Sequence, residues 1–139
     1  MAFRDIAQIA GSAMVAQTVR LNTIASNLAN AQTAAGTEEA AYHARKPVFA
    51  AVMGGDALGD QPGARVQVLD VVQSTEPVRR MHEPGHPLAN ENGEVFYPNV
   101  NTVAEMTDMM AASRAFETNV EVMVRVKSMQ QSLLRLGEG

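Results

Sequence analysis

The chain has 139 residues, a net charge of −4 and no cysteine. The absence of cysteine excludes a disulfide framework, a thiolate metal site and a cysteine nucleophile. The net negative charge makes nucleic acid an unexpected partner. Its apolar residues are mostly Ala, Val and Met, and Leu, Ile, Val and Phe together make up about 22% of the chain, close to the roughly 20% below which a chain struggles to bury a core. We therefore do not expect a self-contained enzyme core, and because no apolar run approaches the roughly 20 residues that span a bilayer, we expect no membrane span.

Residues 2 to about 31 are predicted to form a long amphipathic helix. The stretch has no proline and one glycine, and small or apolar side chains recur in it at heptad spacing. The seam comprises Phe3, Ala7, Ala10, Met14, Gln17, Leu21, Ile24, Leu28 and Ala31. Asn27 and Asn30 lie beside this seam, where a buried Asn can fix the register of helix pairing. Exposed or capping roles are the alternative for both.

The middle of the chain, residues 37–100, changes character because it contains all six prolines. Its apolar pieces are short and β-branched, which predicts strands separated by turns. These pieces are Val48–Met53, Val66–Val72, Val78–Met81 and Val95–Tyr97. Asn92-Gly93 is the best hairpin signal among the turns.

A second long helix is predicted from Asn101 or Thr102 to Leu136, a stretch without Pro or Gly. Asn101 or Thr102 can cap its start, and Glu105 completes a capping-box pattern with Thr102. Gly137 supplies the stop.

The second helix has two neighbouring apolar stripes, which indicates partners on more than one side. One stripe runs through Met106, Met109, Ser113, Phe116, Val120, Met123, Lys127, Gln130 and Leu134. The other runs through Val122, Val126, Met129, Leu133 and Leu136. Asn119 lies beside them. At 1.5 Å per residue both helices would be longer than a compact protein of this size is wide, so we expect a rod-shaped unit.

Two motifs resemble catalytic or phosphate-binding sites. His82-Glu83-Pro84-Gly85-His86 has the letters of the zinc-protease pattern H-E-x-x-H, but Pro84 and Gly85 oppose the helix that this site requires. The Gly-rich segment Met53–Asp60 lacks the Lys and Ser/Thr of a P-loop, and we expect a flexible loop there. We predict no catalytic residue, metal or cofactor.

Three segments together resemble a known family. They are RLNTIASNLANAQT (residues 20–33), EPGHPLANENGEV (83–95) and YPNVNTVAEMTDMMAASRAFETNVEVM (97–123). They are similar to bacterial flagellar basal-body rod proteins of the C type, which are proximal rod subunits, and the resemblance extends over nearly the whole chain. SNLAN is shared by rod and hook axial proteins in general, whereas the two later segments indicate the C type.

The resemblance implies an α+β fold in which long N- and C-terminal helices (1–36 and 101–139) pair as an antiparallel, coiled-coil-like hairpin, with a small β-rich module (37–100) inserted between them. It also implies a non-enzymatic subunit of a helical tube that transmits torque. The implied partners are further copies, other proximal rod proteins, the distal rod protein and basal-body ring and adaptor proteins. The implied location is the flagellar basal-body rod in the periplasm.

The resemblance implies secretion by the flagellar type III export apparatus. The N-terminus lacks a basic lead and a continuous apolar region, so no cleavable signal peptide is expected. The residues expected at the assembly interface are Leu21, Ile24, Asn27, Leu28, Asn30, Met106, Met109, Phe116, Asn119, Val120, Met123 and Leu133. The alternative functions are a soluble helical-bundle adaptor, another rod or hook protein, and a metalloenzyme built on His82 and His86.

Overall fold

The computed structural model describes residues 3–54 and 63–139. The elements are α1 (Phe3–Asn30), β1 (Arg45–Gly54), β2 (Gly63–Gln73), β3 (Arg79–His82), β4 (Glu94–Tyr97) and α2 (Thr102–Gly137). Both predicted helices and all four predicted strands are confirmed, with bounds that differ by a few residues. Most of the predicted loop Met53–Asp60 lies outside the described residues.

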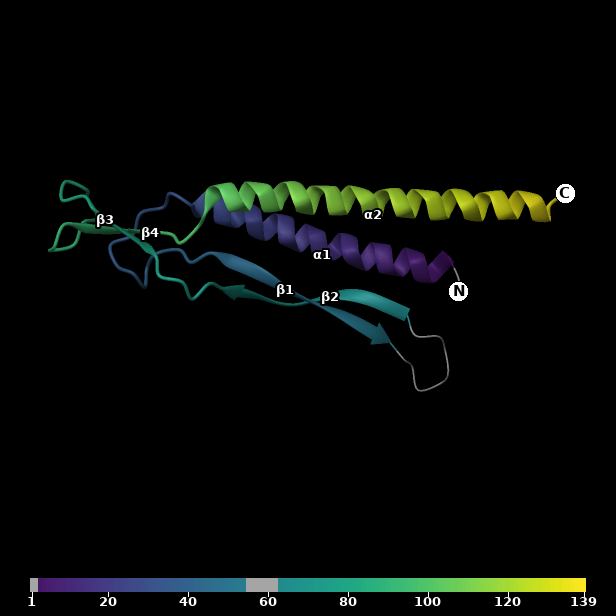
Figure 1. The fold of residues 1–139 in the computed structure, drawn as a ribbon, viewed down its shortest axis with the longest axis horizontal. Coiled ribbons are helices and arrows are strands. Elements are labelled where there is room, and N and C mark those ends of the chain that lie inside the picture. Colours follow the sequence, from purple (N-terminus) through teal and green to yellow (C-terminus); the bar gives the residue numbers. More distant parts are fainter. Residues whose placement is uncertain (1–2, 55–62) are drawn as a thin grey trace.

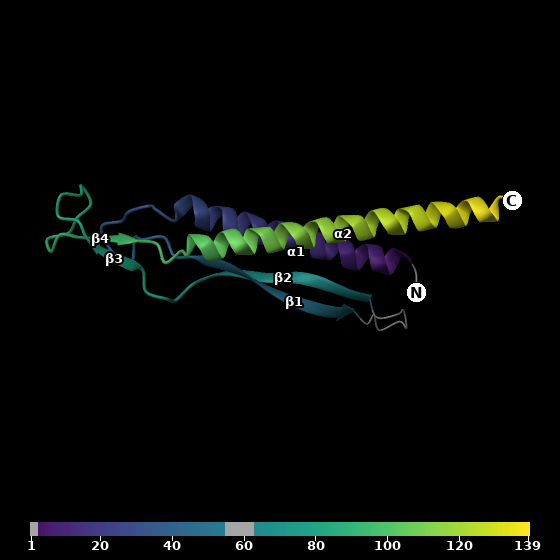
Figure 2. The same ribbon diagram turned by 45° about the horizontal axis from the view of Figure 1, so that its top comes forward.

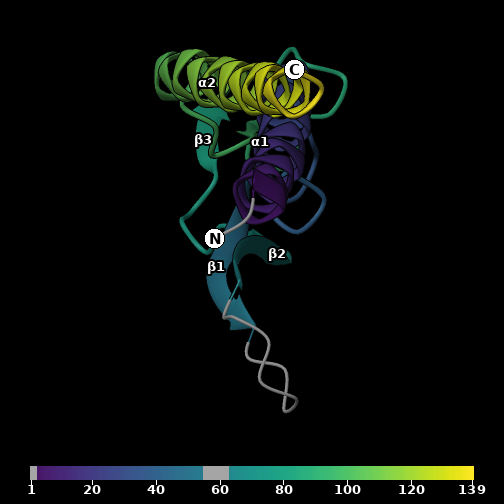
Figure 3. The same ribbon diagram turned by 90° about the vertical axis from the view of Figure 1, so that its right-hand side faces the viewer.

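The two helices run antiparallel along one elongated body, with both chain ends at the same end of it (Figure 1). Viewed along the long axis, α1 lies between α2 on one side and the β1–β2 hairpin on the other (Figure 3). The shorter β3–β4 hairpin lies at the opposite end from the termini. The predicted α+β fold is confirmed, and its β-rich module consists of two separate two-stranded sheets.

Helix α1 is buried on two sides because it lies in the middle layer. Its buried residues are Ala10, Ala16, Thr23, Ile24 and Asn27. Ala10 and Ile24 belong to the predicted seam, whereas Thr23 and Asn27 do not. A single seam therefore describes only part of the packing of this helix.

Helix α2 starts at a side-chain cap. The Asn101 side chain accepts a hydrogen bond from the backbone N–H of Ala104 at 3.2 Å, which satisfies one of the unpaired donors of the first turn. The helix begins one residue later, so Asn101 is the cap and Thr102 is not. With 36 residues α2 is about 54 Å long, which agrees with the predicted rod shape.

The β1–β2 hairpin is antiparallel, with pairs from Arg45 opposite Gln73 to Gly54 opposite Gly63. In the second hairpin, β3 pairs with β4 from Arg79 opposite Tyr97 to His82 opposite Glu94. The connection between β3 and β4 is residues 83–93, so Asn92-Gly93 ends a long loop rather than forming a two-residue turn. Gly93 has φ +73°, a conformation that L side chains rarely adopt.

The surface of the protein is large for its mass. It exposes 9565 Å², whereas a compact monomer of 14.9 kDa would expose about 7000 Å². One small core cluster, Ala31, Ala44 and Val100 with Tyr42 against it, lies where the helices meet the β module. No helix in the described residues is long and apolar enough to cross a membrane.

Candidate assembly surface

An ion pair of Arg20 on α1 with Asp108 on α2 shows how the two helices align, and a second bond runs from Arg20 Nε to Asp108 Oδ2 at 3.3 Å. Because the helices run antiparallel, Ala16, four residues before Arg20, lies opposite Ala112, four residues after Asp108. These two alanines are 2% and 0% exposed. Because Ala has only a methyl side chain, the helix backbones approach closely here.

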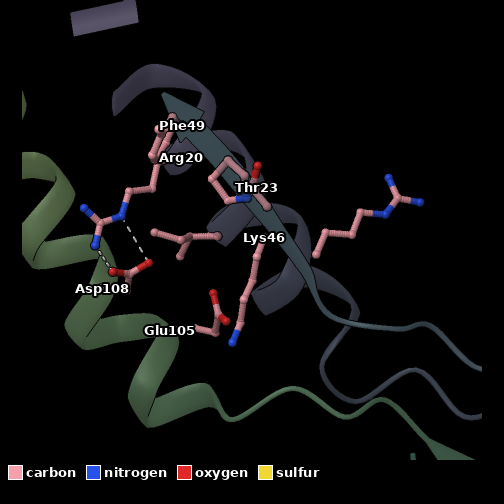
Figure 4. A pocket seen from close by; sticks show the side chains of 9 residues that line it. Arg20, Thr23, Lys46, Phe49, Glu105 and Asp108 are labelled. Atoms are coloured by element: carbon pink, nitrogen blue, oxygen red, sulfur yellow. Dashed lines mark hydrogen bonds and ion pairs between the residues drawn. The ribbon is translucent and has the colours of Figure 1, made fainter. Parts of the chain in front are cut away.

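A three-element junction surrounds this ion pair. A pocket of about 180 Å³ lies between α1, β1 and α2. It is lined by Arg20, Thr23 and Ile24 of α1, by Arg45, Lys46, Pro47 and Phe49 of β1, and by Glu105 and Asp108 of α2. In Figure 4 the Lys46 and Glu105 side chains extend toward each other, beside the Arg20–Asp108 pair. The pocket contains both signs of charge, so the junction favours pairing between elements of the chain over binding of an anion or a cation.

Asn27 connects α1 to the β module. Its Oδ1 accepts bonds from the Arg45 N–H at 2.9 Å and the Tyr42 hydroxyl at 2.8 Å, and its Nδ2 donates to the Arg45 carbonyl at 2.9 Å. The side chain is 1% exposed. The structure thus places Asn27, predicted to lie beside the seam, inside the subunit, where it positions the start of β1 against α1 and has no exposed or capping role.

The outward face of α2 carries a row of uncovered apolar side chains. Val103, Met106, Met110, Val120 and Val124 are 72%, 53%, 60%, 36% and 61% exposed. Together with Ser113 and Glu117, they follow the alternating three- and four-residue spacing of a coiled-coil seam. We name the five apolar residues the outer stripe. Its existence agrees with the expectation that α2 needs partners on more than one side.

The predicted interface residues fall into three groups. Ile24 and Asn27 are buried within the subunit. Leu21, Leu28, Asn30, Phe116, Asn119 and Met123 are half-buried. Met106, Met109, Val120 and Leu133 are exposed. Of the predicted asparagines, Asn30 and Asn119 each donate to the carbonyl of the residue four positions earlier, Ser26 and Ala115.

Sequence reasoning missed the long-range contacts that tie the β module to the end of α1 and hold its own segments together. Arg79 donates to the Ala31 carbonyl beyond the end of α1 and to the Pro98 carbonyl, each at 3.3 Å. The Asn99 side chain accepts from the Ala44 N–H at 2.7 Å. The family segment YPNVN contained Asn99, but no local pattern predicts a bond to a residue 55 positions away.

The two histidines of the H-E-x-x-H letters do not share a helix. His82 ends β3, and His86 lies in the loop, where its Nδ1 accepts a bond from the Leu88 N–H at 3.0 Å. In the part of the chain that the structure describes, no group of three or more His, Cys, Asp or Glu residues is arranged to hold a metal. The geometry therefore offers no support for a metalloenzyme here.

Two family models match the two helical regions. "Flagella basal body rod protein" matches residues 8–34, in α1 and just beyond it, and "Flagellar basal body rod FlgEFG protein C-terminal" matches residues 92–136, which include β4 and most of α2. The chain is 45% identical to the flagellar basal-body rod protein FlgC of Salmonella typhimurium over 138 residues, which cover 99% of this chain and 100% of the relative. It is also 45% identical to FlgC of Escherichia coli O157:H7, with the same coverage, and 31% identical to FlgC of Borreliella burgdorferi over 94% of this chain and 95% of the relative.

Proposed function

The chain belongs to the flagellar basal-body rod protein family, and we propose that it polymerises through its terminal helices as a structural subunit of the proximal rod. The relatives cover the chain from end to end. The relatives are named as rod components, a role that requires contact surfaces rather than catalytic residues. The division into parts 1–36, 37–100 and 101–139 stays a prediction.

The outer stripe is the observation that carries this proposal. Scattered apolar residues are normal on a protein surface, but exposed apolar residues repeated at coiled-coil spacing along one helix face indicate a contact site, here as two groups separated by Ser113 and Glu117. The accessible area of 9565 Å² exceeds that of a compact monomer by about 2500 Å². Burial of this excess between subunits would supply the apolar contacts that the small core lacks.

The predicted interface residues have different parts in this proposal. Met106, Met109, Val120 and Leu133 would contact neighbouring subunits directly, because they are exposed. The half-buried residues Leu21, Leu28, Asn30, Phe116, Asn119 and Met123 would border those contacts. Ile24 and Asn27 would act from inside, by holding α1 in the position that the contacts require.

The proposed neighbours are further copies of the chain, other proximal rod proteins, the distal rod protein and ring or adaptor proteins of the basal body. The proposed location is the part of the rod that crosses the periplasm. We also propose that the chain reaches it through the flagellar type III export apparatus without cleavage of a signal peptide. Membership of a basal-body rod family supports each of these assignments.

The test is a charge placed in the outer stripe. In a strain whose own copy is deleted, Met106→Asp combined with Met110→Asp should abolish motility and remove the protein from isolated basal bodies, because two carboxylates would be buried without partners. The matched control is Thr118→Asp, at an exposed position of α2 away from the stripe.

Purified double variant and control should both keep the helical circular dichroism of the parent, because the substituted side chains are exposed. Normal motility of the double variant would contradict assembly through α2. A stable closed dimer that is dispensable for motility would instead favour the soluble adaptor.

A further inference from the structure

The face of α2 that packs against α1 continues past the end of α1. It follows an unbroken alternation of four- and three-residue steps, which we name the inner seam. Its members are Asp108, Ala112, Ala115, Asn119, Val122, Val126, Met129, Leu133 and Leu136. Asp108 pairs with Arg20 of α1, and Ala112 and Val126 are buried at 0% and 6% exposure, so the first two-thirds of this seam is covered.

The last third of the inner seam is exposed. Phe3 lies 17 residues before Arg20, and Arg125 lies 17 residues after Asp108, so the first described residue of α1 is level with Arg125. Figure 2 shows α2 extending beyond the end of α1. There Met129, Leu133 and Leu136 are 50%, 53% and 78% exposed. We name residues 127–137 the overhang; it is about 16 Å long.

The size of the side chains changes where the cover ends. The covered part of the seam contains small or polar residues such as Ala112, Ala115 and Asn119, whereas the overhang contains Met129, Leu133 and Leu136. The part of the seam with the most apolar surface to bury is thus the part that no described segment of the same chain covers. Since the seam already packs against a helix over its first two-thirds, a helix of another copy with an uncovered face is the kind of partner that fits its last third.

A second copy of the chain presents such a helix. The face of α1 turned away from its own partners carries Val15, Thr18, Asn22, Ala25 and Ala29, all exposed and again spaced by three and four residues. These side chains are small or short and uncharged, as are the covered members of the inner seam after Asp108. Large side chains on one helix and small ones on the other can interdigitate as knobs into holes.

We propose that the overhang of one copy binds the Val15–Ala29 face of α1 in the next copy. The two surfaces differ and lie on different helices, so each copy can bind one neighbour through its overhang and another through α1. Such head-to-tail contacts generate open helical assemblies when the rotation between copies does not close a ring. The inference rests on the proposed function, which it deepens by naming the contacting segments.

Cysteine cross-linking tests the contact cleanly because the chain has no cysteine of its own. A variant with Leu133→Cys and Asn22→Cys is produced in a strain whose own copy of the chain is deleted, and isolated basal bodies are oxidised. We expect disulfide-linked dimers and longer species that contain only this chain. In the matched control, Gln131→Cys with Asn22→Cys, the first cysteine lies on the opposite side of the overhang, and these disulfide-linked species should be absent.

The result separates the contact from the function. Incorporation of the Leu133→Cys, Asn22→Cys variant into basal bodies without disulfide-linked species would overturn the proposed contact, but it would not contradict the rod function. Cross-links through Leu133→Cys alone, without Asn22→Cys, would also overturn it, because they would show two overhangs meeting each other. Absence of the unmodified parent chain from basal bodies would overturn the proposed function itself, whatever the cross-links.

Discussion

Asn27 and Arg45 are joined by a reciprocal pair of hydrogen bonds, each 2.9 Å long: the Arg45 N–H donates to Asn27 Oδ1, and Asn27 Nδ2 donates to the Arg45 carbonyl. The carboxamide thus pairs with the backbone of the first residue of β1 as a neighbouring strand would. The Tyr42 hydroxyl adds a third bond to the same side chain and lies 3.1 Å from Ser26 Oγ. One side chain of α1 therefore sets where the β module begins.

Asn27→Ala should lower the free energy of unfolding by about 2–4 kcal/mol, because it removes three hydrogen bonds and leaves the Arg45 backbone groups without partners. Urea denaturation followed by circular dichroism measures the change. The matched control is Asn22→Ala, an exposed asparagine on the same helix, which should stay within about 0.5 kcal/mol of the parent. Equal losses of unfolding free energy in both variants would contradict a stabilising role for the Asn27–Arg45 hydrogen bonds.

Periodicity predicted the elements because each follows from local spacing. A stretch without Pro or Gly and with heptad spacing gives α1 and α2, and β-branched runs between turns give the strands. The Asn27–Arg45 hydrogen bonds could not be predicted in this way, because they depend on the position of Arg45 in three dimensions. From the sequence Asn27 is a polar residue beside a seam, and nothing local shows that its partner is the backbone of a strand 18 residues away.

The candidate surface was predictable to a similar extent. Met106, Met109 and Val120 were identified from spacing and are exposed on α2. Spacing could not separate the covered stripe from the uncovered one, since both repeat at the same interval. The face that meets α1 is the one that carries Asp108 and the buried Ala112, and the Arg20–Asp108 contact that reveals it joins residues 88 positions apart.

The Arg20–Asp108 pair should contribute little to stability by itself. Its side chains are 26% and 41% exposed, and such partly solvated pairs contribute about 0.2–1 kcal/mol. A double-mutant cycle of Arg20→Ala and Asp108→Ala, measured by urea denaturation, should give a coupling energy in this range that falls as salt is added. A coupling energy unchanged by salt would contradict the view that the pair is screened by solvent.

Tyr97 provides a pH-dependent contact between β4 and the loop that follows β3. Its hydroxyl donates to Glu83 Oε2 at 2.9 Å, and this bond, desolvation and the Glu83 charge raise the pKa of Tyr97 above 10.0, against a smaller opposing effect of Arg79. A raised pKa in the folded state means that the stabilisation is complete below pH 10 and is lost as the pH rises through the folded value.

NMR titration of the Tyr97 ring should give a midpoint above 10. Glu83→Gln should move that midpoint down toward the ordinary value, because it removes the carboxylate that disfavours the phenolate. An unchanged Tyr97 midpoint in the variant would exclude Glu83 as the cause.

The close approach of the helices at Ala16 and Ala112 makes a sharp steric prediction. Ala112 is 0% exposed, so Ala112→Leu must force the helices apart or distort side-chain rotamers, and it should destabilise the protein by about 1–3 kcal/mol. Ala111→Leu adds the same side chain at the neighbouring exposed position and should change stability by no more than about 0.5 kcal/mol.

Because α1 is held against α2 by small residues rather than by a large apolar core, the Ala112→Leu variant should also lose amide-exchange protection in α1 before the β3–β4 hairpin loses its own. Equal protection in both regions would show that the close helix contact is not what holds α1 in place.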